Sequence, residues 1–332
     1  MRFLCFLILA TQWAVASASD EIVVALQNRL EADKPFGDLV DSVAEMPVAE
    51  MKQFSAEFEA GWKRLRANYL LAFQRHADSL YSGSNRNEKK RRVRELREEF
   101  HRVRELPEGA MKSELVDVSM PAMEELRRLL MPDAAVIMAK APADLRQQHK
   151  LVHGLARFRD ELMEVSVSYG ENGSVEGLQA AEAEVAREHT DVDRSGLRIM
   201  EKNDSIAESG GVSPLEREGI REVNEWRLLL DQNALVIDPK LCDAGRGHSQ
   251  DMEEHDFFAH MSPIPGKKTP SDRAREAGTR GGGENIYMGA PRPEAANKGW
   301  FFSPGHHKNM FRPNYRKIGL GQHNRHWTQM FS

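Results

Sequence analysis

The sequence contains little cysteine. Its 332 residues include two, Cys5 and Cys242, and no Cys-x-x-Cys pair. This spacing excludes a cysteine-type zinc finger and a thioredoxin-like motif. If a leader that includes Cys5 is removed, no intrachain disulfide can form and burial must hold the fold together. We expect Cys242 to be a small buried residue on a helix rather than a nucleophile.

The sequence also lacks a long apolar run. The apolar stretch at residues 3–10 is shorter than the roughly 18 residues that a membrane span needs. It follows Arg2 and precedes Ala16-Ser17-Ala18, a small-x-small arrangement that signal peptidase accepts. We interpret residues 1–18 as a signal peptide cleaved near Ala18. The sequence therefore predicts a secreted protein, extracellular or periplasmic, with no transmembrane segment.

A large excess of one charge is missing as well. The formal net charge is -5 and 29% of the residues are charged, which is typical of an ordinary solvated surface and argues against a nucleic-acid partner. Residues 86–104 are a local exception, where arginine and lysine alternate with glutamate at helical spacing. This pattern favours an exposed, salt-bridged helix over a basic docking surface.

Residues 19–205 carry a helical pattern and little else. Apolar side chains recur every three or four residues, and proline and glycine mark the breaks. The pattern predicts helices at 47–80, 87–106, 111–130, 143–165 and 175–188, arranged as an antiparallel bundle or a stalk. We find no clustering of histidine, cysteine and carboxylate residues there, and expect residues 170–172 (GEN) in a loop. The role of this region is not given by its sequence, and self-association is one option.

A linker at residues 206–213 separates this region from the rest. Ser213, Pro214 and Glu216 combine a cap, a first-turn proline and a capping-box acid, so a helix should begin at Pro214. A second helix is expected at 239–252 and two strands at 317–331. The inner face of the first helix should carry four apolar side chains: Ile220, Val223, Trp226 and Leu230.

Three short motifs lie between residues 256 and 310. They read DFFAHMSP (256–263), GGENIY (282–287) and SPGHHKNM (303–310), and each sets a histidine or a glutamate beside residues that turn or cap the chain. Folding can therefore bring His260, Glu284 and His306 to one cleft from three separate elements.

These motifs belong to a longer series that resembles a known family. The series comprises Asn224-x-x-Arg227, HSQDM (248–252), FFAHMSP (257–263), GENIY (283–287), Trp300, SPGHHKNM (303–310), KIGLG (317–321) and WTQMF (327–331). In this order and spacing, residues 214–332 resemble the CAP superfamily. This is the SCP domain of cysteine-rich secretory proteins, antigen 5 and pathogenesis-related proteins, and the likeness is to its short bacterial, cysteine-free branch.

The resemblance implies an α+β fold, with an α-β-α sandwich around a small antiparallel sheet. It also implies a cleft lined by two histidines and two acids. His260, Glu284 and His306 match three of these positions, whereas Phe301 and Phe302 follow Trp300 where other members place the second glutamate. The site is therefore a triad, or another side chain completes it.

Two imidazoles and a carboxylate suit zinc or another divalent cation in an open site. The alternative is structural, because Glu284 can accept backbone N–H groups while His260 and His306 hydrogen-bond within the interior. We expect His248 to pack within its helix and His307 to face solvent.

The remaining conspicuous side chains have structural roles on this interpretation. One ring of the Phe301–Phe302 pair should face inward and the other border the cleft. Asn285 and Asn309 are expected to hydrogen-bond loops and helix ends. The residues expected in the core are Trp300, Trp327, Phe257, Phe258, Ile286 and Ile318.

Three hypotheses of function follow. The first is a non-enzymatic binding module whose cleft takes a small ligand, a lipid, a metal or a protein partner. The second is an envelope or extracellular assembly protein organised by its helices. The third is a metal-dependent hydrolase acting through His260, Glu284 and His306.

Overall fold

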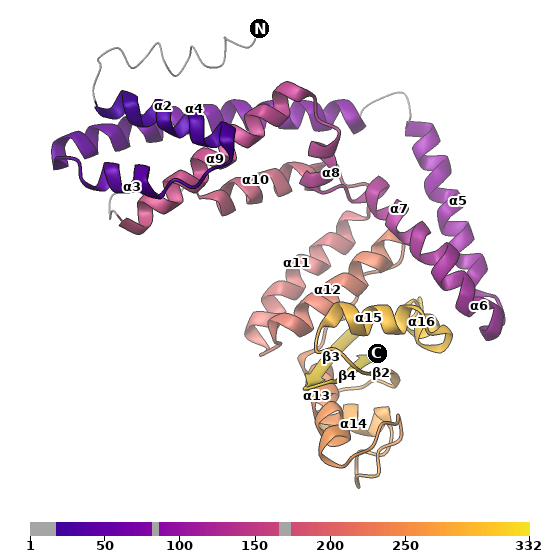
Figure 1. Ribbon diagram of the computed structural model, residues 1–332. Helices are drawn as coiled ribbons and strands as arrows, with labels where there is room; N and C mark the ends of the chain where they lie inside the picture. Colours follow the sequence, from indigo (N-terminus) through magenta and orange to yellow (C-terminus); the bar gives the residue numbers. More distant parts are fainter. Residues whose placement is uncertain (1–17, 82–85, 166–173) are drawn as a thin grey trace. The chain divides into compact units, whose positions relative to one another are not determined.

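The computed structural model describes residues 18–81, 86–165 and 174–332 (Figure 1). The chain forms two compact units: a first unit of Met1–Arg86 with Pro132–Thr190, and a second unit of Asn87–Met131 with Asp191–Ser332. These boundaries differ from the expected helical region at 19–205, since residues 87–131 and 191–205 lie in the second unit. The expected signal peptide, up to residue 17, and the GEN turn at 170–172 lie outside the described residues.

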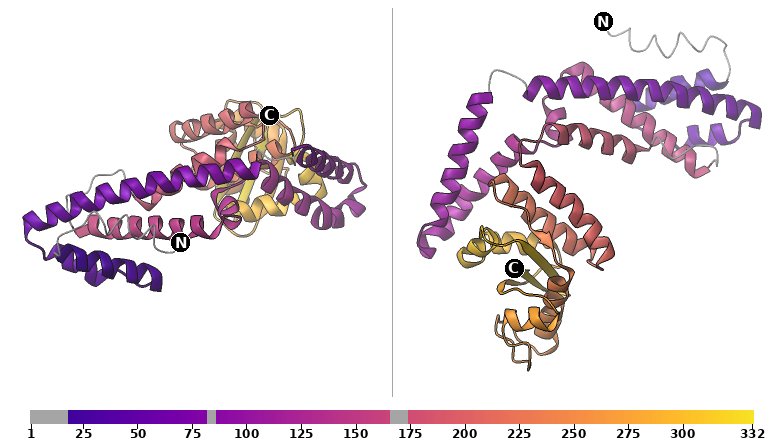
Figure 2. Two further views of the ribbon diagram at one scale, coloured as in Figure 1. Left: turned by 90° about the horizontal axis from the view of Figure 1, so that it is seen from above. Right: turned by 180° about the vertical axis from the view of Figure 1, so that it is seen from behind.

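Helices make up the described part of the first unit. They are α2 (Ala18–Ala32), α3 (Gly37–Ala44), α4 (Val48–Tyr81), α8 (Ala134–Ala139), α9 (Ala143–Val165) and α10 (Val175–Glu188). Helix α9 packs against α3, α4 and α10 (Figure 2). Phe54, Trp62 and Phe158 are buried in one cluster, and Tyr69 and Phe73 in another. The helices expected at 47–80, 143–165 and 175–188 are thus confirmed within a residue or so at each end.

A helical hairpin opens the second unit. It comprises α5 (Arg86–Arg104), α6 (Glu108–Glu114), a π-helical turn η1 (Leu115–Ser119) and α7 (Met120–Leu130). On its charged side, Arg92 pairs with Glu125 of α7 at 2.7 Å. On its other side, Leu96 and Phe100 are buried in the core of the second unit. The expected salt-bridged helix is confirmed, with an apolar face that docks on this unit. The helix expected at 111–130 is interrupted by η1.

The remaining helices of the second unit surround a sheet. They are α11 (Arg194–Ser209), α12 (Pro214–Leu229), α13 (Pro239–Glu254), α14 (Pro270–Glu276), α15 (Pro293–Phe301) and α16 (Pro304–Met310). Residues 206–209, expected in a linker, therefore belong to α11. The capping box at Ser213 and Glu216 is present, and all four expected inner-face residues of α12 are buried.

The sheet has four strands in the order β1-β3-β4-β2. They are β1 (Val236–Ile237), β2 (Gly283–Met288), β3 (Lys317–His323) and β4 (His326–Phe331). The expected pair of C-terminal strands is confirmed, and β2 also pairs antiparallel with β4. The short β1 runs parallel to β3, so the sheet is mixed and the expectation of an antiparallel sheet was wrong in this respect.

Glycines in the KIGLG motif let α13 approach the sheet. A Cβ on Gly321 would meet the Arg246 backbone nitrogen at 2.0 Å, and one on Gly319 would meet the Leu241 carbonyl carbon at 2.4 Å. Leu320, between them, points to the opposite face, where its side chain lies against Gly219 of α12. Helices α13 and α12 therefore cover opposite faces of the sheet, as Figure 1 shows, and the α-β-α sandwich is confirmed. None of the described helices is long and apolar enough to cross a membrane.

Candidate functional site

The second unit contains a polar cavity of about 620 Å³. His260 reaches it from the loop between α13 and α14, Glu284 from β2, and His306 from the first turn of α16. Folding therefore brings all three sequence-predicted residues to the lining of one cavity. Their roles remain predictions. The complete lining is Arg104, Glu105, His260, Glu284, Asn285, Ser303, Gly305, His306, Lys308, Asn309 and Arg312.

The Glu284 carboxylate is buried and engaged on both oxygens. His260 Nδ1 donates to Oε1 at 2.9 Å, and Arg273 Nη2 donates to Oε2. Arg273 is itself 2% exposed, so a guanidinium neutralises the buried acid. Among the residues near Glu284, Arg273 is the one that the sequence interpretation missed. Its position on α14, outside the motifs, gave no signal.

The two histidines of the cavity differ in exposure. The His260 side chain is 48% exposed, whereas His306 is half-buried, and their ring centroids lie 6.2 Å apart. Burial, and to a smaller extent the neighbouring His260, lowers the pKa of His306. His306 is therefore favoured in its neutral form at pH 7, where one ring nitrogen can accept a hydrogen bond from a ligand.

An amide network fixes the strand that carries Glu284 to the helix that carries His306. Asn309 Nδ2 donates to the Glu284 carbonyl at 3.1 Å and to Asn285 Oδ1 at 2.9 Å. Tyr315 donates its hydroxyl proton to Asn309 Oδ1 at 2.8 Å. The two asparagines therefore hydrogen-bond between elements, and the GENIY and SPGHHKNM motifs form one rigid wall of the cavity.

In this arrangement His260, Glu284 and His306 do not fit a metal ion. Within the described residues, their ligand atoms are not among the sets that all lie within 4.8 Å of one another. Both Glu284 oxygens already accept hydrogen bonds, one of them from a cationic guanidinium that opposes a second positive charge. The donor set suits a polar ligand better than a bare cation.

Several neighbouring residues differ from expectation. His307, expected in solvent, is fully buried against Phe301, and its Nδ1 donates to the Phe301 carbonyl at 2.8 Å. Phe302 does not border the cavity but packs near Met111 and Leu115. Both differences have the same cause. The α5–α7 hairpin covers a surface that would be exposed if the segment resembling the CAP family stood alone.

Three further side chains can be compared with their expected positions. His248 is buried on α13 and its Nε2 donates to the Ala259 carbonyl at 3.1 Å, as an interior histidine would. Burial lowers the pKa of His248 to about 4. Cys242 is buried on the same helix, and burial raises its pKa to about 12. Phe258, expected in the core, is 46% exposed, because it lies in the loop after α13.

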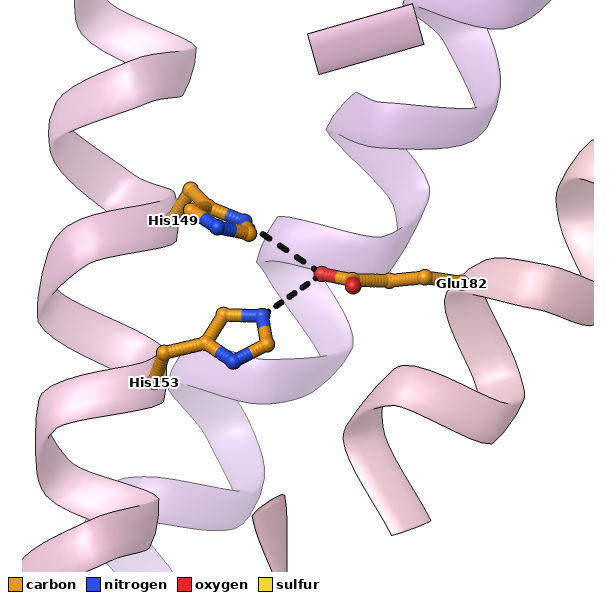
Figure 3. A group of neighbouring side chains, drawn as sticks. All are labelled: His149, His153 and Glu182. Carbon is orange, nitrogen blue, oxygen red and sulfur yellow. Dashed lines mark hydrogen bonds and ion pairs between the residues drawn. The ribbon is translucent and has the colours of Figure 1, made fainter. Parts of the chain in front are cut away.

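The first unit holds a second group of histidine and glutamate. His149 and His153 project from α9 toward Glu182 of α10 (Figure 3). Within the described residues, these three form the set whose ligand atoms all lie within 4.8 Å of one another. The expectation that this region lacks such a cluster was therefore wrong. The spacing of four between the two histidines was the one available signal, since Glu182 is 29 residues beyond His153.

The fold and the cavity define a class: a small α-β-α sandwich with a polar cleft lined by His260, Glu284 and His306. Residues 220–331 match the family model described as CAP, the Cysteine-rich secretory protein family. The chain therefore carries a CAP domain over these residues.

Two bacterial relatives support this assignment. An uncharacterized protein, YkwD, of Bacillus subtilis (strain 168) is 35% identical over 133 residues, which cover 39% of this chain and 51% of the relative. The uncharacterized membrane protein YlbC of the same organism is 33% identical over 99 residues, 29% of this chain and 28% of the relative. The chain thus spans about half of YkwD and less of YlbC.

A solved structure is similar as well. It is an extracellular protein containing a SCP domain from Bacillus anthracis str. Ames, with 28% sequence identity and a TM-score of 0.34. The similarity covers 40% of this chain and 42% of that chain.

Proposed function

We propose that the CAP domain is a non-enzymatic binding module whose cavity takes a small polar ligand with an anionic group, such as a carboxylate or a phosphate. The observation that carries this proposal is the charge of the lining. Arg104, Lys308 and Arg312 supply three cationic groups to the cavity, and Arg and Lys are the usual partners of carboxylate and phosphate.

The acidic residues of the lining do not offset this charge. Glu284 is already paired with Arg273, which leaves Glu105 as the other carboxylate of the lining. Arg104 and Glu105 come from the α5–α7 hairpin, which lies outside the segment that matches the family. This hairpin therefore completes the cavity, and we expect it to contribute to ligand selectivity.

A hydrolytic function through the same triad has weaker support. It requires either a metal held by His260, Glu284 and His306 or a carboxylate free to accept a proton from water. Glu284 accepts hydrogen bonds on both oxygens instead. Secretion is also part of the proposal, and rests on the signal-peptide pattern of residues 1–18.

Calorimetric titration with a panel of small anions tests the proposal. The panel contains inorganic phosphate, a phosphate monoester, dicarboxylates and short acidic peptides, each titrated into the full chain. We expect at least one member to bind, and Lys308→Ala with Arg312→Ala to weaken it at least about tenfold, since two charge-assisted hydrogen bonds are lost. Lys268→Ala, an exposed lysine outside the cavity lining, is the matched control.

Neutral analogues of the same size complete the experiment. If they bind as well as the anions, or if the double variant binds as tightly as the native chain, the assignment of an anionic ligand to this cavity is contradicted. A His260→Ala/His306→Ala variant that binds normally would show that the two histidines do not contribute to ligand binding. It would leave the role of the cationic lining residues unchanged.

A further inference from the structure

We propose that His149, His153 and Glu182 form a binding site for a divalent cation of the zinc class in the first unit. The site is separate from the CAP cavity and does not depend on the function proposed for it. It consists of two imidazole nitrogens from α9 and one carboxylate oxygen from α10, the ligand types that zinc takes in proteins.

The local backbone places the two histidines on one face. They are four residues apart on α9, so their side chains lie one above the other on the same side of the helix. Their ring centroids are 4.1 Å apart, and both rings turn toward the Glu182 carboxylate (Figure 3). The four-residue spacing on α9 therefore supplies two ligands, and the packing of α10 against α9 supplies the third.

The distances suit a tetrahedral ion. Zinc–nitrogen and zinc–oxygen bonds of about 2.0–2.1 Å in a tetrahedron place ligand atoms roughly 3.3 Å apart. Glu182 Oε1 lies 3.3 Å from His149 Nδ1 and 2.8 Å from His153 Nε2. Small rotations of the side chains would therefore admit an ion between atoms that already converge.

The charge of the group also favours a cation. Glu182 is 4% exposed, and a buried carboxylate needs a partner that balances its charge. Its partners are His149, His153 and the Tyr69 hydroxyl, and no lysine or arginine of the described residues forms an ion pair with it. With both imidazoles neutral, the group carries one negative charge that a divalent cation would offset.

Tyr69 supports the ligands from a third helix. Its hydroxyl group on α4 donates to Glu182 Oε1 at 2.5 Å and lies 2.7 Å from His149 Nδ1. A donor that holds a ligating carboxylate in place is a typical companion of metal sites. A cation can reach the group past His149, whose side chain is 35% exposed.

The same contacts can also be read as a metal-free hydrogen-bond network that joins α4, α9 and α10. In that case the Tyr69 hydroxyl and His153 Nε2 donate to Glu182 without a metal, and added zinc finds no site. The two readings differ in one measurable property, the affinity of the native chain for the metal.

Zinc titration of the chelator-treated full chain separates them. We expect roughly one zinc ion per chain at this site and a rise in melting temperature on the order of 5 °C at saturating zinc. His149→Gln/His153→Gln and Glu182→Gln should each weaken binding at least about tenfold. The matched control is His76→Gln, a first-unit histidine whose Nε2 instead contacts the Ile137 carbonyl at 3.3 Å.

A conservative variant guards against a folding defect. His153→Cys keeps a zinc ligand at the same position, so it should retain zinc where His153→Gln loses it. A native chain that binds no zinc overturns the proposal. It is equally overturned if the double histidine variant binds zinc as tightly as the native chain, or if His260→Gln/His306→Gln abolishes binding instead.

Discussion

The two units each bury a glutamate beside histidines, but they neutralise it differently. In the second unit Glu284 faces His260 and the buried guanidinium of Arg273. In the first unit Glu182 faces two imidazoles and a tyrosine hydroxyl. Because arginine stays charged and cannot ligate a metal, the group around Glu284 is closed to cations. Imidazole can exchange a proton for a metal, so the group around Glu182 is open to them.

Similar residue types can therefore form sites with different chemistry. Whether the site can bind a cation depends on which groups contact the carboxylate. Motif matching finds the CAP cavity and describes it as a histidine–glutamate site. The contacts of Glu284 instead make it part of a fixed wall, and the cationic residues opposite become the groups available to a ligand.

The largest expected effect comes from removing the guanidinium that distinguishes the two centres. Arg273→Ala leaves a buried carboxylate without its cation, and also removes bonds to the carbonyls of His260 and Lys267. We expect a loss of about 3–5 kcal/mol in the free energy of unfolding of the second unit. Urea denaturation followed by tryptophan fluorescence measures it.

Arg275→Ala is the control for this change. It lies on the same helix and also pairs with an acid, Asp272, but its side chain is 75% exposed, so no measurable change is expected. A stable Arg273→Ala protein would show that Glu284 does not need the guanidinium, and the contrast between the two units would fail.

Acid should weaken the second unit through His307. Burial lowers the pKa of His307 to about 3, so the unfolded state takes up the proton first as the pH falls. The contribution of this residue to stability is therefore complete above about pH 6.5 and declines toward pH 3, by on the order of 4 kcal/mol. His307→Gln cannot titrate and should flatten that part of the profile. An unchanged slope in the variant would refute the assignment.

A smaller effect is expected in the first unit. Tyr69→Phe removes a hydrogen bond to the Glu182 carboxylate and should cost about 1.5 kcal/mol of unfolding free energy. If the hydroxyl acts through the carboxylate, the same change in a Glu182→Gln background should cost less, as a double-mutant cycle reveals. Equal costs in both backgrounds would place the role of Tyr69 elsewhere.

The smallest expected effect concerns Cys242, which can report on the second unit alone. Its raised pKa and complete burial predict no alkylation of the native chain at pH 8. In a Cys5→Ser background, labelling should begin only when denaturant unfolds the second unit. Rapid labelling of the native chain would contradict the buried position and remove this reporter.

Local signals in the sequence were sufficient for much of the fold. The capping box at Ser213 predicted the start of α12, and the pattern of residues 317–331 predicted the two strands β3 and β4. The motifs DFFAHMSP, GGENIY and SPGHHKNM indicated that His260, Glu284 and His306 would meet. Each of these predictions depends on neighbours in sequence or on a resemblance that spans the CAP domain.

The remaining features depend on contacts between distant segments. A two-residue strand such as β1 carries too short a pattern to reveal its parallel pairing. The burial of His307 requires Phe100 of α5, about 200 residues earlier in the chain. The meeting of His153 with Glu182 depends on how α10 returns along α9. None of these contacts has a local signature, so periodicity and motifs could not supply them.

Anomalous diffraction from zinc-soaked crystals of the full chain tests the central contrast most directly. We expect a strong peak about 2.0–2.2 Å from His149 Nδ1, His153 Nε2 and Glu182 Oε1, and none between His260, Glu284 and His306. A peak in the CAP cavity with none beside Glu182 would contradict it.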